Sequence, residues 1–316
     1  MPRCVGLLLV PVAVACGGAP KSVDPADRAK PSPVKPAPTA EKVATGQLMT
    51  EVELDTKPGL SGLAADDKGR LWAVAERDLV AYRITLNSQL KPTLETFPIA
   101  GVPKDTDLEA MEELGDDHFA FGTEGRGNNS ATIMLAQRKG NELVITSTIQ
   151  LPADKIGLKL ADNHGAEGLC GSGGTLIVGI EEVGLDNGKR WAPILRVADG
   201  KLVRRHRLWL TSATGKISAL DCTIDKAGAV RVWAIERHFE VSRILTFTLP
   251  PMGQGDDDIT PRIALDLGPT MRPHINLEGI AELPDGRIIA VNDNQYTSID
   301  GPSFLFVFRA GALSFE

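Results

Sequence analysis

The sequence predicts an all-β fold, because one hairpin pattern recurs five times along the chain and no segment shows a convincing helical periodicity. The clearest copy, NLEGIAELPDGRIIAVNDN at residues 276–294, contains two strand-like runs around Asp285-Gly286, a dipeptide typical of tight hairpin turns. The four related stretches are residues 60–78, 108–126, 166–184 and 217–238. They recur at intervals of about 50 residues, which is typical of the four-stranded units of a β-propeller.

Strand-like runs between the hairpins supply the outer strands of each unit. Two such runs follow each of the first four hairpins, as in residues 79–86 and 93–100. Only one run, residues 303–311, follows the fifth hairpin, whereas residues 47–55 precede the first hairpin without a partner. The sequence therefore predicts a β-propeller of five four-stranded blades, in which the N-terminal strand completes the fifth blade and closes the ring. A ring of six blades would need strands that the sequence does not supply.

The N-terminal residues predict an exported protein. Residues 1–15 contain a basic residue, an apolar run and a final Ala-Val-Ala, which is typical of a secretory signal. The junction before Cys16 also resembles a bacterial lipobox, so we expect lipidation at Cys16, with ordinary signal cleavage as the alternative. Residues 16–46 are rich in Pro, Ala and Lys and predict a disordered tether. Residues 47–316 are then the propeller domain, a monomer in the cell envelope that reaches a membrane only through the lipid anchor.

Composition and cysteine usage narrow the classes of partner. The 316-residue chain has a formal net charge of −7, and such an acidic excess disfavours binding to nucleic acid or to anionic membrane surfaces. No Cys/His spacing predicts a zinc site. Cys170 and Cys222 fall on equivalent strands of successive hairpins. An exported protein can carry them as a disulfide or as two buried thiols.

Acidic residues recur at equivalent positions of the hairpins. Because the first strand of each blade lines the central channel of a propeller, these positions are expected to converge. Counting outward from the turn places Glu278 directly opposite Asp293. The same count in the other hairpins predicts eight carboxylates at one mouth of the channel: Glu76, Glu109, Glu124, Glu167, Glu181, Glu236, Glu278 and Asp293.

Such a cluster predicts a bound cation. Carboxylates crowded together have raised pKa values and repel one another, and calcium resolves this conflict because it takes about six to eight oxygen ligands. The sequence therefore predicts calcium at the eight acids. The alternative is that the acids are structural and accept hydrogen bonds from backbone N–H groups or pair with arginines.

Basic residues and histidines near the same mouth predict a site for an anion. Arg77, Arg126, Arg237 and His238 follow the closing acids and are suited to hold a phosphate group. His164 and His274 precede two of the opening acids, where either could act as a general acid or base. A water molecule activated by the cation would be the nucleophile.

The repeated motifs also resemble a known family. GLSGLAADDKGRLWAVAERD, DLEAMEELGDDHFAFGTEG, GAEGLCGSGGTLIVGIEE and INLEGIAELPDGRIIAVNDN resemble the bacterial phytase-like family, described as having esterase-like activity of phytase. The resemblance covers residues 59–308 and implies an exported β-propeller that hydrolyses a small phosphorylated molecule with calcium. The chain departs from the motif at Ala110, which replaces a glycine, and at ISALDC, which lacks both Glu and Gly. A non-catalytic propeller that binds a ligand or partner at the cell surface is the alternative.

Overall fold

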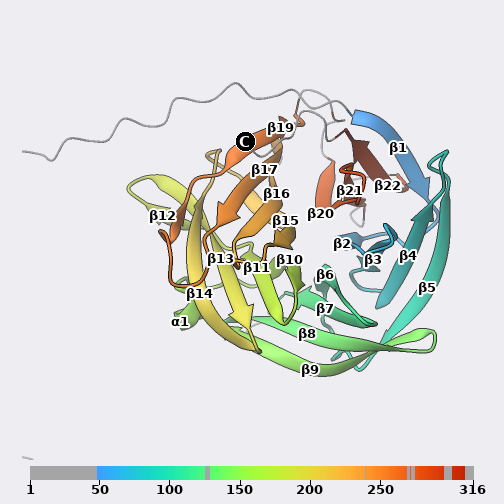
Figure 1. The fold of residues 1–316 in the computed structure, drawn as a ribbon, viewed down its shortest axis with the longest axis horizontal. Helices are drawn as coiled ribbons and strands as arrows, with labels where there is room; N and C mark the ends of the chain where they lie inside the picture. The colour runs from blue at the N-terminus through green and yellow to red at the C-terminus, as the bar shows by residue number, and fades with distance from the viewer. Residues whose placement is uncertain are drawn as a thin grey trace, which may run out of the picture. The chain divides into compact units, whose positions relative to one another are not determined.

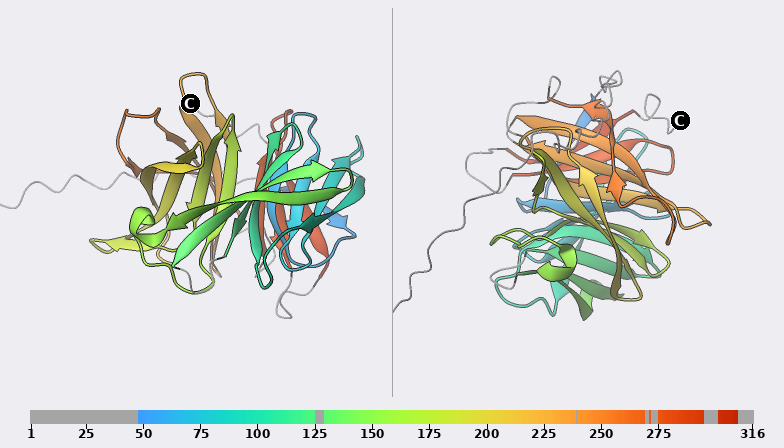
Figure 2. Two further views of the ribbon diagram at one scale, coloured as in Figure 1. Left: turned by 90° about the horizontal axis from the view of Figure 1, so that it is seen from below. Right: turned by 90° about the vertical axis from the view of Figure 1, so that its left-hand side faces the viewer.

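The computed structural model describes residues 48–124, 129–238, 240–268, 271, 275–294 and 301–309, which form an all-β fold (Figure 1). In this part of the chain the short helix α1 (Ala153–Ile156) is the single helical element, and it lies on the outside of the β-structure (Figure 2). The all-β prediction is therefore confirmed. None of the described residues forms a helix that is long and apolar enough to cross a membrane. The predicted signal peptide, Cys16 and the tether lie outside the described residues.

The strands of the described residues pair into four sheets. One sheet contains, in pairing order, β1 (Leu48–Leu54), β22 (Ser303–Phe308), β21 (Ile288–Asp293) and β20 (Asn276–Glu282). A second contains β15 (Lys216–Ile224), β16 (Val230–His238), β17 (Val241–Leu249) and β19 (Arg262–Asp266). A six-stranded sheet contains β10 (Ala166–Ser172), β11 (Thr175–Ile180), β13 (Lys189–Ala198), β14 (Lys201–Trp209) and β18 (Asp258–Ile259), with β12 (Gly184–Asp186) beside β13. An eight-stranded sheet contains β2 (Leu60–Ala65), β3 (Leu71–Ala75), β4 (Val80–Leu86), β5 (Pro92–Ala100), β9 (Glu142–Pro152), β8 (Ser130–Lys139), β7 (His118–Thr123) and β6 (Leu108–Gly115).

Two short parallel pairings extend two of the sheets beyond the four strands expected from the sequence. Strand β5 pairs with β9 at only two positions, Ile99 opposite Leu143 and Ala100 opposite Val144. Without this pairing the eight-stranded sheet is two antiparallel meanders of four strands. Strand β18 pairs with β14 in the same short, parallel way. The hydrogen-bonded sheets therefore do not separate into five four-stranded units, because outer strands of neighbouring units approach closely enough to bond.

The burial of the strands follows their sequence patterns. The second strands of the hairpins, such as β3 and β21, are buried at every residue, which fits their mainly apolar sequences, since both faces are covered. Outer strand β5 alternates between buried and exposed residues near its C-terminal end, as expected for a strand with one solvated face. The apolar core lies between neighbouring sheets and between the two four-stranded halves of the eight-stranded sheet.

Five inner strands surround a common centre (Figure 1). Strands β2, β6, β10, β15 and β20 each contact the next in this order, and β20 in turn contacts β2. A disulfide between Cys170 and Cys222, with Cα atoms 5.7 Å apart, joins β10 to β15. Of the two alternatives left open by the sequence, the structure has the disulfide.

Each inner strand has a β-bulge near its N-terminal end, where its register with the following strand shifts. The shifts fall between Ser61 and Leu63, Leu108 and Ala110, Ala166 and Gly168, Ile217 and Ala219, and Leu277 and Gly279. A bulge adds a residue to one strand and re-aims its side chains. Asn276 therefore lies opposite Asp293, and Glu278 falls within the bulge. The prediction that Glu278 lies directly opposite Asp293 was wrong for two reasons. Glu282 pairs with Ile288 across the turn, one residue off the predicted register, and the bulge shifts the register by one residue more.

Glycines beside the bulges let neighbouring inner strands approach closely. Gly62 has a φ of +61°, and a Cβ there would overlap the backbone nitrogen of Met111 in β6. In the second hairpin Ala110 replaces the motif glycine, but its cross-strand partner is Gly122. The space for the Ala110 methyl group thus comes from a glycine on the neighbouring strand.

Candidate functional site

The bulges set which residues lie at one end of the five inner strands, which we call the mouth. With the bulges aligned, the equivalent residues at or just beyond the mouth end of the second strands are Glu76, Glu124, Glu181, Arg237 and Asp293. Their partners on the inner strands are Gly59, Asp107, Gly165, Lys216 and Asn276. In the fourth hairpin the residue equivalent to the closing acids is therefore Arg237. Glu236 is the residue before it and pairs with Ile217.

Glu236 is fully buried. Its carboxylate accepts hydrogen bonds from the backbone N–H groups of Thr211 and Ser212, each at 3.0 Å, and from both hydroxyl groups. Four donors thus satisfy this carboxylate. Glu236 therefore has the structural role that the sequence analysis gave as the alternative to cation binding. Glu236 fixes the loop that precedes β15.

Three acids from the first two hairpins influence one another strongly. Burial raises the pKa of Glu76 to about 7; Arg77 opposes this increase, whereas Asp293, Asp107 and Glu124 add to it. Burial and the negative charges of Glu76, Glu124 and Glu278 raise the pKa of Glu109 well above its usual range. Glu76, Glu109 and Glu124 therefore form a group whose charges are mutually unfavourable.

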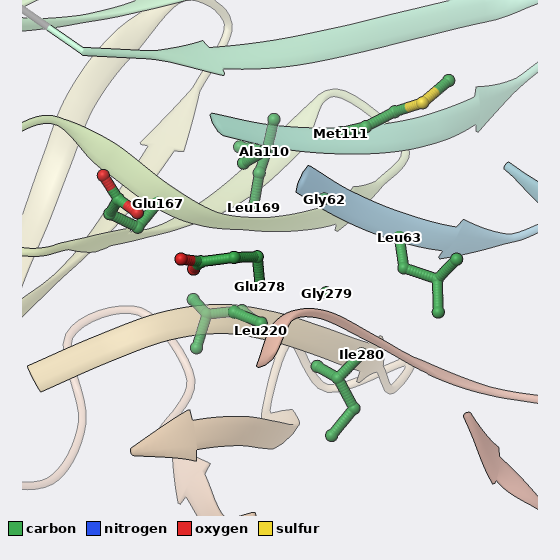
Figure 3. A pocket seen from close by; sticks show the side chains of 11 residues that line it. Gly62, Leu63, Ala110, Met111, Glu167, Leu169, Leu220, Glu278, Gly279 and Ile280 are labelled. Atoms are coloured by element: carbon green, nitrogen blue, oxygen red, sulfur yellow. The ribbon is translucent and has the colours of Figure 1, made fainter. Parts of the chain in front are cut away.

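Glu167 and Glu278 extend the acidic group between the inner strands. Figure 3 shows both side chains among the residues that line a narrow pocket, whose other lining residues are glycines and apolar residues of the inner strands. Burial, Glu109 and Glu278 raise the pKa of Glu167 well above its usual range. The pKa of Glu278 is also raised by burial, although Arg237 lowers it. Glu278 Oε2 is buried without a hydrogen-bond partner among the described residues.

Two cations from the fourth hairpin face these acids. Lys216 and Arg237 lie directly opposite each other in β15 and β16. Lys216 pairs with Glu181, and Arg237 pairs with Glu278. The side chains of Lys216 and Arg237 are 26% and 16% exposed, so both are reachable from the mouth. Burial and the charge of Arg237 lower the pKa of Lys216.

The remaining predicted residues lie around the same mouth or outside the described chain. Arg77 is 48% exposed and pairs with Glu76 at 3.2 Å and with Asp107 at 3.9 Å. His164 Nδ1 lies 3.0 Å from a carboxylate oxygen of Glu182, and its Nε2 lies 3.7 Å from Glu181. Half-buried His238 ends β16. Arg126 and His274 lie outside the described residues.

The serines that replace glutamate at two bulges bind the neighbouring strand. Ser218 Oγ donates a hydrogen bond of 2.8 Å to the backbone oxygen of Leu277. Ser61 Oγ lies 2.8 Å from the backbone oxygen of Glu109 and 3.1 Å from its Oε2. In these two hairpins the bulge residue therefore connects adjacent inner strands instead of adding a carboxylate.

Sequence reasoning missed Lys216, Asp107 and Glu182. Lys216 and Asp107 each stand two residues before the bulge position of their hairpins, as Asn276 does. Comparing that position across the five copies could have placed Lys216, Asp107 and Asn276 at the mouth. Glu182 carried no such signal, because it follows a closing acid that had already been assigned.

The donor set at the mouth fits a hard cation by its chemistry, since carboxylate oxygens that repel one another are the ligands that calcium takes. The buried Oε2 of Glu278, which has no hydrogen-bond partner among the described residues, adds an acceptor that such a cation could use. Within the described part of the chain, however, no three Asp, Glu, His or Cys side chains are already placed to hold a metal ion.

The fold resembles those of propeller-type enzymes. An exo-β-1,3-galactanase from Phanerochaete chrysosporium matches with a TM-score of 0.50 and 10% identity, over 83% of this chain and 63% of the galactanase. This chain thus spans less than two thirds of that protein. The aldose sugar dehydrogenase from Streptomyces coelicolor, in its PQQ-bound form, matches with a TM-score of 0.48 and 12% identity, over 84% of this chain and 98% of the dehydrogenase. The galactanase likeness shows the fold alone.

The assignment of the chain to a family rests on its sequence. None of the curated proteins compared with the chain matches it. The model of the phytase-like family, described as esterase-like activity of phytase, matches residues 55–296. This match covers most of the chain and includes all five inner strands and their bulges. The chain belongs to the phytase-like family.

Proposed function

We propose that this protein is a calcium-dependent phosphoester hydrolase whose site is the acidic mouth of the channel. The observation that carries the proposal is the group formed by Glu76, Glu109 and Glu124, in which burial and the neighbouring negative charges, that of Glu124 among them, raise the pKa values of Glu76 and Glu109. Membership of the phytase-like family supports the same activity. A small phosphorylated molecule is the substrate class.

In this proposal some residues of the mouth bind the cation and others bind the phosphate. Glu76, Glu109 and Glu124, with Asp293, would hold calcium through carboxylate oxygens. Calcium bound there would supply positive charge that stabilises the charge developing on a phosphoryl oxygen. Arg77 and Arg237 would orient the phosphate by charge-assisted hydrogen bonds. His164, held at Nδ1 by Glu182, would move a proton at Nε2 as a general acid or base.

The proposed architecture is a five-bladed propeller, exported and anchored by a lipid at Cys16. The contacts of the five inner strands in a closed order support the number of blades, and the pairing of β1 with β22 supports closure by the N-terminal strand. The signal-like residues 1–15 support export. The protein would then act in the cell envelope, as a monomer tethered to the membrane.

The experiment compares calcium binding with catalysis. Added calcium should raise the melting temperature of the wild-type protein and should be required for hydrolysis of a phosphomonoester such as p-nitrophenyl phosphate. Glu109→Gln with Glu124→Gln should abolish both effects, whereas Glu113→Gln, farther along the same strand as Glu109, should retain them. If the double variant keeps both the calcium shift and the hydrolysis, the proposed function is wrong.

A second function, binding of a ligand without catalysis, is favoured by one observation. Lys216 and Arg237 already neutralise Glu181 and Glu278 within the protein, so part of the mouth needs no metal. Under this function, calcium would neither shift the melting temperature nor support turnover.

A further inference from the structure

Residues 250–259, which we call the strap, follow β17 and run along the outer edge of β14. Within the strap, β18 pairs with β14 in the same direction, with Ile259 opposite Leu208. The backbone N–H of Arg207 also donates to the backbone oxygen of Asp257 at 2.7 Å. The strap thus covers the last strand of one sheet with chain that connects β17 and β19 of another. Such a cover hides the backbone groups that make an edge strand prone to pair with other strands.

Arginine side chains of β13 and β14 hold the strap in place. Arg204 in β14 donates to three of its backbone oxygens, those of Pro251, Gln254 and Gly255. It also pairs with Asp257 at 2.8 Å. Arg196, which lies opposite Arg204 in β13, donates to the backbone oxygen of Pro250 at 3.0 Å. The strap therefore lies over two cations that oppose each other across the sheet, an arrangement in which like charges repel.

His206 lies beside these arginines and is fully buried. It stands two residues after Arg204, so both side chains lie on the same face of β14. Its Nδ1 lies 3.8 Å from Oδ1 of Asp257, which is longer than a hydrogen bond. A proton on the buried ring would add a third cation beside Arg196 and Arg204. Asp257 would offset only part of that charge, because it already pairs with Arg204.

The charge of His206 depends on whether the strap is closed. With the strap closed, burial lowers the pKa of His206 to about 4, and the positive charges of Arg204 and Arg196 contribute to this decrease. Asp257 and the backbone of Asp256 oppose it. Release of the strap would expose the ring and return its pKa toward the ordinary value of about 6.5. The neutral ring therefore stabilises the closed strap fully above about pH 6.5, and this contribution is lost as the pH falls toward about 4.

We propose that the strap is a pH-sensitive cover for the edge of β14, which opens when His206 takes up a proton. Mild acid would then free backbone groups of β14 that the strap occupies at neutral pH, so the edge would become able to pair with another strand. Histidine is the side chain that ordinarily gains a charge between about pH 7.5 and pH 5, which is the range in which the strap would respond. The inference does not depend on the proposed function, because it involves neither calcium nor a residue at the mouth.

The test measures amide hydrogen exchange of the full chain by mass spectrometry at pH 7.5 and pH 5, with rates corrected for the intrinsic effect of pH. A pKa of about 4 in the closed form and of about 6.5 in the open form predict about 25-fold less protection of the strap at pH 5. Peptides from β20 and β21 should keep their protection, because the change is local.

Matched glutamine variants separate His206 from the other histidines. His206→Gln cannot take up the proton, so the protection of its strap should be the same at both pH values. His118→Gln, at the exposed start of β7, should keep the decrease seen in the wild type. If His206→Gln does not fold, His206→Leu removes the titration without burying an amide.

Four results would overturn the inference. In the wild type these are free exchange of the strap at pH 7.5, equal protection of the strap at both pH values, and an equal decrease in β20 and β21, which would indicate unfolding of the whole domain. The fourth is a decrease in protection that persists when His206 is replaced.

Discussion

Asn276 lies directly opposite Asp293 at the mouth end of β20 and β21. Its Nδ2 donates to Asp293 Oδ2 at 3.0 Å and to Glu278 Oε1 at 2.8 Å. A neutral amide thus bridges two buried carboxylates and reduces their repulsion. The last hairpin tolerates its acids because this amide donates a hydrogen bond to each of them.

Asn276→Asp should make the protein more dependent on calcium. The substitution places a third carboxylate beside Glu278 and Asp293, so the melting temperature in chelator should fall. Added calcium should then raise the melting temperature by more than it does in the wild type. Differential scanning fluorimetry measures both effects, with Asn141→Asp in an exposed turn as the control. A calcium shift no larger than that of the wild type would contradict the prediction.

Glu236→Gln should destabilise the fold without changing calcium binding. The amide that replaces the carboxylate has one acceptor oxygen for the four donors of Thr211 and Ser212. We expect a loss of about 1–3 kcal/mol in the free energy of unfolding, measured in urea. Glu240→Gln, an exposed change in the following turn, should cost little. A normal stability together with a lost calcium shift would instead make Glu236 a ligand.

Gly62→Ala should be far more damaging than Gly115→Ala. Both glycines have positive φ values, +61° and +86°, which favour glycine. A Cβ at Gly62 would overlap the backbone of Met111, whereas a Cβ at Gly115 meets nothing within 4 Å. We expect Gly115→Ala to cost about 1 kcal/mol and Gly62→Ala to cost about 3 kcal/mol or more. Equal costs in urea denaturation would mean that the backbone conformation alone matters.

Glu112→Gln should make the protein less sensitive to rising pH. Burial, and then the charge of Asp221, raise the pKa of Glu112 well above its usual range, although the Gly171 N–H opposes this. In the unfolded chain the carboxyl ionises near pH 4. Its contribution to stability is therefore complete below about pH 4 and is lost as the pH rises toward the folded-state pKa. Glutamine cannot ionise, so this loss should disappear.

Urea denaturation at pH 5 and pH 8 tests this difference. The wild type should lose more stability between the two pH values than Glu112→Gln loses. Glu142→Gln, an exposed change, should behave as the wild type. If Glu112→Gln and the wild type lose equal stability, Glu112 is not protonated in the folded protein.

The sequence predicted the hairpins well because their turns and strand formers are local signals. Asp285-Gly286 marks the turn of the last hairpin, and the strands on either side begin and end close to the predicted positions. The pairing of β5 with β9 could not be predicted, because two hydrogen-bonded positions between distant strands leave no pattern in either one.

The site was only partly predictable, because a shift of one residue in the strand register changes which side chain lies at the mouth. Glu236 matched the other closing acids in type, but the pairing of Ala219 with Ile235 and of Ile217 with Glu236 places Arg237 at the equivalent position. The length of the turn in this hairpin carries no clear sequence signal, and a glutamate one residue before the true position disguised the difference. Lys216 was overlooked for the same reason, since its importance depends on which residue faces it.

Leu48 pairs with Phe308, so the first and last described strands are hydrogen-bonded neighbours. The order of strands in space therefore does not depend on where the polypeptide is cut. A circular permutant that joins residue 308 to residue 48 through a linker, with new ends at the turn around Gly140, should keep the same strand pairings. The mouth, built from residues of all five hairpins, would then be unchanged in a protein whose N- and C-termini lie at the turn around Gly140.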